Sequence, residues 1–190
     1  MDLFLSGDNN FRKKIYPEYK ANRRKMIRPP SLEYMKDWFK LNYPVHIQDE
    51  VEADDLLGLA QDDTTCIVSI DKDMLMIPGW HYNYVKNELK YVNYLDGLHH
   101  FYTQLLVGDT ADNIKGAKGI GVAKAQRILM DCETEEDMLN ATYPYFSCWE
   151  EYDMTAKLLW IRRKGRIDWN DTGIGESKKE IDGEIYSQFE

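Results

Sequence analysis

The feature that most constrains the fold is a short apolar run, TTCIVSI at residues 64–70, followed directly by Asp71 and Asp73. The run is rich in β-branched residues and too short for a typical helix, as expected of a parallel strand buried on both faces. Residues 3–5 and 45–47 are two further short candidate strands. Strands of this kind need helices to cover them, so the sequence predicts an α/β fold with a mostly parallel sheet flanked by helices.

Helical periodicity separates the candidate strands. Apolar residues recur at helical spacing over 32–39 and 95–106, residues 51–61 are a further candidate helix, and Ser31 suits the N-cap of the first. Residues 80–94 are expected to form one or two edge strands, and 135–164 to be helical. The chain therefore divides into a sheet domain, a glycine-punctuated helical region and a polar, poorly ordered tail, at 1–107, 108–169 and 170–190.

Charge is distributed unevenly along the chain. The net charge is −9, yet residues 1–40 hold ten Lys and Arg against five Asp and Glu, whereas the remainder holds fourteen against twenty-eight. This pattern separates a basic arm from an acidic body. No apolar run reaches the roughly 18 residues that span a membrane, and the N-terminus does not resemble a signal peptide. Three widely spaced cysteines fit a reducing compartment, so a cytoplasmic location is expected.

Four acidic clusters each follow a predicted strand or open a predicted helix. Residues i and i+2 of an extended chain point the same way, so Asp71 and Asp73 can reach one ion. Sites of α/β sheets form at the carboxyl ends of the strands, where all four clusters can converge. The predicted metal-binding set is Asp8, Glu52, Asp54, Asp55, Asp71, Asp73, Asp109 and Asp112.

Taken one cluster at a time, these acids have simpler explanations. Residues 52–55 suit the positive end of a helix dipole, and Asp71 with Asp73 suits a charged turn. Eight unpaired carboxylates in one place would repel each other strongly, and only cations relieve that repulsion. Oxygen ligands without cysteine or a nearby histidine favour Mg²⁺ or Mn²⁺, and two or more such ions suit phosphodiester hydrolysis.

Residues 114–125 (IKGAKGIGVAKA) have the form of a helix-hairpin-helix DNA-binding turn. Gly119 and Gly121 let the backbone approach a phosphate, and the following helix offers unpaired N–H groups. Lys118 and Lys124 add positive charge, and such contacts position DNA without reading its sequence. A plain helix connector is the alternative, but the preceding GDTADN sequence at 108–113 makes the combination more specific.

Residues 9–30 interleave cations with aromatic residues and are expected to form an exposed arm. Cations such as Arg12 neutralise phosphates, and tyrosine rings stack on unpaired bases. A solvated basic loop is the alternative. The closeness of the arm to Asp8 in the sequence favours a functional role.

Five motifs in this order resemble the flap endonuclease / 5′-3′ exonuclease family over residues 3–165. They are FRKKIYPEYKANR, EADD, SIDKD, GDTADN and GxxGIGxxxA. The family includes phage enzymes and the 5′-nuclease domain of bacterial DNA polymerase I. The resemblance implies a PIN-like α/β domain, a helical arch at 9–30, two or three divalent ions, and cleavage of branched or 5′-ended DNA. By motif match, the acidic set takes the metal positions, Lys20 and Arg23 steady the scissile phosphate, and Tyr19 stacks on a base. Gly119 and Gly121 match the turn that holds the duplex, often with a monovalent ion such as K⁺.

One departure from the family concerns the N-terminus. Family members begin with a strand carrying another metal-binding Asp, tens of residues before the position of Asp8, whereas this sequence starts seven residues before it. A truncated sequence, a second polypeptide that supplies the strand, or a loss of catalysis would each explain this. The first two are the working hypotheses, because the arch and the downstream carboxylates survive.

The leading functional prediction is a Mg²⁺-dependent 5′ nuclease of phage or bacterial replication, acting on flaps, DNA 5′ ends or RNA–DNA hybrids. A catalytically impaired junction-binding protein is the alternative. A general acidic cation-binding protein is disfavoured by the basic arm and the glycine turn.

Overall fold

The computed structural model describes residues 1–23 and 27–175. The strands are β1 (Leu3–Ser6), β2 (Val45–Gln48), β3 (Cys66–Val68), β4 (Gly79–Asn83), β5 (Glu88–Val92), β6 (Gly108–Asp109) and β7 (Ile114–Lys115). The α-helices are α1 (Phe11–Ile15), α2 (Ser31–Asn42), α3 (Ala53–Ala60), α4 (Tyr94–Val107), α5 (Val122–Leu129), α6 (Glu135–Thr142) and α7 (Trp149–Leu159). Three 3₁₀ helices complete the order: η1 (Ala21–Arg23), η2 (Lys72–Met76) and η3 (Tyr143–Tyr145).

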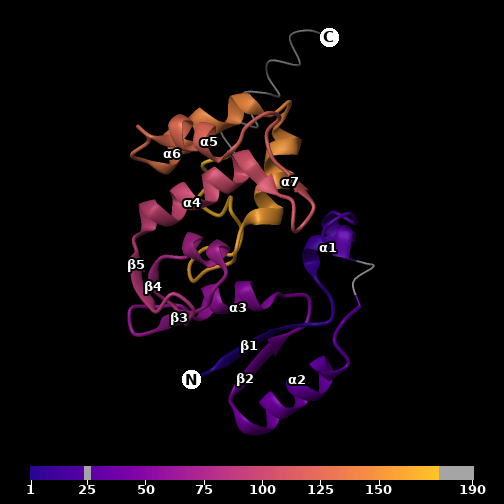
Figure 1. Cartoon of the computed structure of the whole chain (residues 1–190). Helices are drawn as coiled ribbons and strands as arrows, with labels where there is room; N and C mark the ends of the chain where they lie inside the picture. Colours follow the sequence, from indigo (N-terminus) through magenta and orange to yellow (C-terminus); the bar gives the residue numbers. More distant parts are fainter. Residues whose placement is uncertain (24–26, 176–190) are drawn as a thin grey trace.

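The predicted α/β fold with parallel pairing is confirmed, but its strands lie in separate groups. β1 pairs in parallel with β2, β3 pairs in parallel with β4, and β5 closes the second group as an antiparallel edge. Helix α3 connects β2 to β3 and lies above β1 and β2 (Figure 1). The two groups are not hydrogen-bonded to each other within the described structure.

Helix α4 forms the centre of the hydrophobic core. Phe101, Tyr102 and Leu105 on this helix are fully buried, and α5, α6 and α7 surround it (Figure 1). Ile67 from β3 and Trp160 after α7 belong to the same core cluster. The predicted regions 1–107 and 108–169 are therefore joined by shared apolar packing.

The basic arm is less exposed than its composition predicted. It contains α1 and η1, and the side chains of Arg12 and Tyr19 are 3% exposed. At the other end, Trp169 is buried and the backbone of Gly175 lies against Trp149. Residues 24–26 of the predicted arch and 176–190 of the predicted tail lie outside the described residues.

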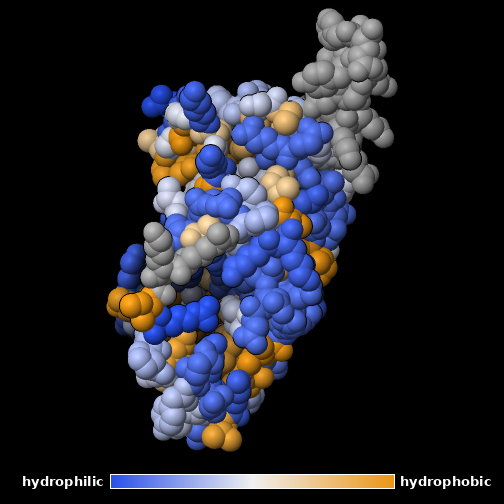
Figure 2. Space-filling model, turned by 90° about the vertical axis from the view of Figure 1, so that its right-hand side faces the viewer, coloured by the Kyte–Doolittle hydropathy of each residue, from blue (hydrophilic) through white to orange (hydrophobic). Residues whose placement is uncertain are grey.

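The face that carries α1 is largely hydrophilic, with apolar residues in scattered groups (Figure 2). Across residues 1–23 and 27–175, no helix is long and apolar enough to cross a bilayer. An exposed hydrophilic face beside α1 is consistent with a polar ligand approaching from that side.

Candidate active site

Five of the predicted metal-binding residues meet around one small hollow of about 30 Å³. The hollow lies between the start of α3, η2 and the loop after α4. Its acidic residues are Glu52, Asp54, Asp73, Asp109 and Asp112. The sequence-based expectation that separate acidic clusters approach one another therefore holds for these five.

Local hydrogen bonds fix where the helices that carry these acids begin. Glu52 and Asp55 form a capping box that starts α3. The Asp71 side chain accepts a hydrogen bond from the backbone N–H of Asp73 at 3.0 Å and so starts η2. The Asp109 carboxylate accepts one from Ala111 N–H at 2.8 Å. Acids at helix starts thus have the capping role expected of them, while several also face the hollow.

The site carries uncompensated negative charge. Burial, followed by the charges of Glu52 and Asp71, raises the pKa of Asp54 to about 6. Burial and the charge of Asp71 also raise the pKa of Asp73 above its usual value. Asp73 Oδ1 is buried without a hydrogen-bond partner among the described residues. An orphaned carboxylate oxygen in an acidic hollow favours a cation there.

Asp55 and Arg12 have a different role from the one predicted for them. Arg12 donates to both oxygens of Asp55, at 2.7 and 2.9 Å, and to the carbonyl oxygens of Leu158 and Trp160. Asp55 is fully buried and also accepts from Arg162 N–H. Burial alone would raise the pKa of Asp55, but the hydrogen bond and charge of Arg12 hold it below its usual range. Both side chains are thus taken up by this buried pairing, and the metal role of Asp55 and the DNA contact of Arg12 stay predictions.

Base stacking by Tyr19 stays a prediction, and the structure shows a further role for this residue. Its ring is buried, and its hydroxyl lies 2.8 Å from Glu52 Oε2 and 3.0 Å from Asp112 Oδ2. The ring presents no open face in this structure. Instead, Tyr19 connects two acids of the hollow.

Lys20 and Arg23, the predicted phosphate-binding pair, lie at the edge of the hollow. Lys20 Nζ is 2.5 Å from Glu52 Oε1 and 3.3 Å from Asp112 Oδ2. The Arg23 guanidinium pairs with Asp112 and is 45% exposed. Two cations next to buried acids are placed to meet a phosphate entering from solvent.

Asp71 and Asp8 complete the predicted set with different outcomes. Asp71 is exposed, but its charge acts on both Asp54 and Asp73, so it lies beside the hollow. Asp8 is exposed just beyond β1, and no contact joins it to the other acids. In the described part of the chain, no three acidic, His or Cys side chains converge closely enough to hold a metal alone.

The glycine turn lies on the surface where α5 begins. Gly119 has a left-handed backbone with φ of +73°, and a Cβ at Gly119 or Gly121 would meet nothing within 4 Å. Gly121 caps α5 without a side-chain hydrogen bond, which leaves the first N–H groups of the helix available. Lys118 and Lys124 are exposed beside it. This arrangement has the geometry of a phosphate-binding turn.

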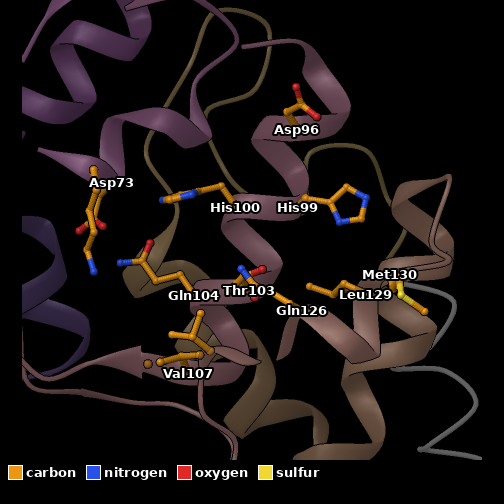
Figure 3. Close-up of a pocket in the computed structure, with 13 residues that line it drawn as sticks. Asp73, Asp96, His99, His100, Thr103, Gln104, Val107, Gln126, Leu129 and Met130 are labelled. Atoms are coloured by element: carbon orange, nitrogen blue, oxygen red, sulfur yellow. The ribbon is translucent and has the colours of Figure 1, made fainter. Parts of the chain in front are cut away.

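Gln104 is a site residue that sequence analysis missed. It projects from α4 toward Asp73 (Figure 3), and its amide opposes the rise in the pKa of that carboxylate. Its Oε1 is buried without a partner among the described residues. Gln104 also lines a cavity of about 440 Å³ that extends from Asp73 to Gln126 on α5. A polar residue within the apolar stripe 95–106 was the only signal in the sequence.

The residues around the hollow fit a divalent cation of the hard type. The donor atoms are carboxylate oxygens, and Asp73 offers one that has no partner within the described structure. Mg²⁺ keeps several waters and is commonly bound through one or two carboxylates. Convergence of three protein ligands is therefore not required.

Three comparisons place these observations among known proteins. The family model "5′-3′ exonuclease, N-terminal resolvase-like domain" matches residues 2–98, just over half of the chain. DNA polymerase I of Borreliella burgdorferi is 31% identical over 153 residues, covering 69% of this chain and 17% of that protein. The 5′-3′ exonuclease of Buchnera aphidicola is 30% identical over 159 residues, covering 73% of this chain and 54% of that protein. The chain thus spans about half the length of the second relative and a smaller part of the first.

Solved structures confirm the predicted PIN-like α/β fold. The T5 5′-exonuclease with bound zinc has a TM-score of 0.62 at 21% identity, covering 83% of this chain and 73% of that one. The bacteriophage T5 flap endonuclease in complex with DNA and metal ions has a TM-score of 0.60 at 18% identity, covering 84% and 72%. Together with the family match and the acidic hollow, these similarities show that the chain belongs to the 5′-3′ exonuclease family.

Proposed function

We propose that this chain carries the active site of a divalent-metal-dependent, structure-selective 5′ nuclease acting on branched or 5′-ended DNA. The observation that carries the proposal is the hollow in which five acids meet and Asp73 keeps an orphaned oxygen, with Lys20 and Arg23 at its edge. The T5 relative solved with DNA and metal ions supports the same class of substrate and cofactor.

The division of labour follows from the geometry. Glu52, Asp54, Asp73, Asp109 and Asp112, with Asp71 nearby, would hold the cations, for which Mg²⁺ or Mn²⁺ is proposed. Divalent ions at such a site lower the pKa of a bound water and neutralise charge on the leaving oxygen. Lys20 and Arg23 would bind the scissile phosphate and keep it facing the acids. The turn at Gly119 and Gly121 would hold the duplex backbone, with K⁺ as a candidate ligand of the same turn.

Cleavage of a 5′-labelled flap in Mg²⁺ and in EDTA tests the proposal. Asp71→Asn and Asp73→Asn are expected to abolish cutting while leaving DNA binding intact or improved, because removing negative charge lowers the repulsion of phosphate. Asp63→Asn is the matched control, since Asp63 is an exposed acid away from the hollow. Unchanged cleavage by both site variants would refute the site assignment.

Lys20→Ala is expected to slow cutting by orders of magnitude with little loss of stability. RNA–DNA hybrids and blunt 5′ ends assayed beside the flap define substrate preference. The alternative is a junction-binding protein that does not cut. Flap binding without Mg²⁺-dependent products would support that alternative.

A second part of the proposal concerns the gap between the strand groups. A groove of about 640 Å³ lies between β1 and β3, and its lining includes Phe4, Leu57 of α3, and Ile67. β1 and β3 each pair on one side only within the described structure. Val68 and Cys66 of β3 are exposed. A groove between two unpaired strand edges is complementary to one extended segment that hydrogen-bonds to both.

We propose that a strand of a second polypeptide occupies this groove and runs parallel to β1 and β3. Its carboxyl end would then emerge between Asp8 and Asp71, which follow those strands. Alkylation of Cys66 tests this, because Cys66 lines the groove while Cys148 is half-buried elsewhere. Co-expression with a separate polypeptide that carries such a strand should give a one-to-one complex in which only Cys66 is protected. A monomeric chain that cleaves flaps while Cys66 stays reactive in the mixture would overturn it.

A further inference from the structure

The acids of the hollow divide into two groups by how their charge is balanced. Both oxygens of Glu52 and both of Asp112 have partners on the basic arm. Asp73, by contrast, keeps an oxygen without a partner in the described part of the chain. The cations on Glu52 and Asp112 are side chains of the protein itself, chiefly Lys20.

We infer that Lys20 is a displaceable internal counter-ion, which a divalent cation must remove from Glu52 and Asp112 before those acids can bind it. The inference rests on the proposed metal-dependent function. Lys20 Nζ lies 2.5 Å from Glu52 Oε1. It therefore occupies the oxygen lone pairs that a bound metal ion would use. An ammonium group and a divalent cation bound to the same carboxylate would also repel each other.

The displaced ammonium has a defined place to go. The Lys20 side chain is 18% exposed and the Arg23 side chain 45% exposed, so a phosphate that approached from solvent would meet both. Metal binding would therefore load the acids and free Lys20 for the phosphate in a single exchange. The same side chain serves as counter-ion before metal binding and as phosphate ligand after it.

Only the side chain needs to move in this exchange. The backbone N–H of Lys20 donates to the carbonyl oxygen of Asp112 at 2.8 Å, and Asn113 Nδ2 donates to the Glu18 carbonyl oxygen at 2.8 Å. Lys20 itself is held in the left-handed region, with φ of +54°. An anchored backbone keeps the four-carbon side chain next to the site while its ammonium changes partner.

Arg12, by contrast, is a cation that a metal ion would not displace. It is 3% exposed and donates to Asp55 and to two carbonyl oxygens as well as to Glu52. Its guanidinium is tied to the fold by bonds that a metal does not compete for. Lys20 has only the two acids as side-chain hydrogen-bonding or ion-pair partners in the described structure.

Mn²⁺ binding to the whole chain, read from the electron paramagnetic resonance signal of free Mn²⁺, provides the first test. Lys20→Met is expected to bind Mn²⁺ about tenfold more tightly than wild type, which corresponds to about 1.4 kcal/mol. Lys14→Met removes the same charge from the same arm, but Lys14 pairs with exposed Glu50. The affinity of this variant for Mn²⁺ should therefore stay within about twofold of the wild-type value. If wild type binds Mn²⁺ and Lys20→Met binds no more tightly, the counter-ion role is overturned while the metal site stands.

A second test uses wild-type protein and does not depend on a variant folding. Acylation of lysines by an amine-reactive reagent, read by mass spectrometry, should be slow at Lys20 and should rise severalfold when Mg²⁺ is added. Lys14, which is 59% exposed, should react equally in both conditions. If Lys20 only repelled the metal ion and were not displaced by it, Lys20→Met would bind the metal more tightly but Lys20 reactivity would not rise with Mg²⁺. That result would overturn the exchange. Absence of Mn²⁺ binding in wild type and variant alike would overturn the proposed metal function itself.

Discussion

The guanidinium of Arg12 spans both oxygens of Asp55, at 2.7 and 2.9 Å, and joins the basic arm to the first turn of α3. Both side chains are buried, so the pair acts on stability and on the position of α3. The neighbouring Asp54 carries no such partner and faces the hollow. Adjacent acids on one helix turn therefore have opposite roles.

Asp55→Asn is expected to lower the free energy of unfolding by about 3–5 kcal/mol, because it removes the bidentate carboxylate partner of the buried Arg12 charge and leaves only Glu52 to balance it. Urea denaturation followed by circular dichroism measures the change. Asp63→Asn should change the same quantity by less than about 0.5 kcal/mol, since Asp63 is exposed. Equal stability of Asp55→Asn and wild type would show that the pair does not anchor the arm.

The raised pKa of Asp54 predicts that its contribution to stability changes with pH in the opposite direction to that of a paired acid. Burial and then the charges of Glu52 and Asp71 raise its pKa from 3.8 to about 6. Between those values the folded protein binds a proton that the unfolded chain releases, so this group makes stability fall as pH rises. Relative to wild type, Asp54→Asn should gain about 2 kcal/mol of stability between pH 4 and pH 7 in EDTA. Parallel stability curves for the two proteins would contradict the raised pKa.

The sequence supported the parts of the fold that depend on local pattern. The TTCIVSI run contains β3, and the acids of residues 52–55 opened α3 as expected. The predicted burial of this strand on both faces was wrong, because Cys66 and Val68 of β3 are exposed. The roles of Arg12 and Tyr19 could not be predicted, because they depend on partners far along the chain. Arg12 meets Asp55 43 residues away and Leu158 146 residues away, and such pairings leave no periodic signal.

The same limit applies to Gln104 and to the gap between β1 and β3. Gln104 matters only because α4 brings it beside Asp73, which lies on a different element (Figure 3). The strand pattern predicted β1 and β3 correctly, but pairing partners depend on which strands meet in space. Sequence pattern thus identified the acids better than it identified the residues that balance or orient them.

Gln104→Leu is expected to lower the rate constant of flap cleavage by about tenfold and to raise the Mg²⁺ concentration needed for half-maximal rate. The reason is that the Gln104 amide points toward Asp73 and interacts with its carboxylate. The affinity for flap DNA in Ca²⁺ should not change. Gln126→Leu is the matched control, because Gln126 lines the same cavity from α5 (Figure 3). A fall in DNA affinity instead of rate would mean that Gln104 contacts DNA directly.

Gly119→Ala tests the turn, and the chain supplies its own control in Gly165. Both glycines have left-handed backbones, with φ of +73° and +78°, and a Cβ at either would meet nothing within 4 Å. Each alanine variant should therefore lose about 1 kcal/mol of stability through backbone strain. Only Gly119→Ala is expected to weaken flap binding, by about tenfold, because its Cβ would lie where a phosphate approaches the start of α5. Fluorescence anisotropy at fixed salt measures this affinity. Equal binding losses in both variants would trace the effect to strain, and the turn would then be a plain connector.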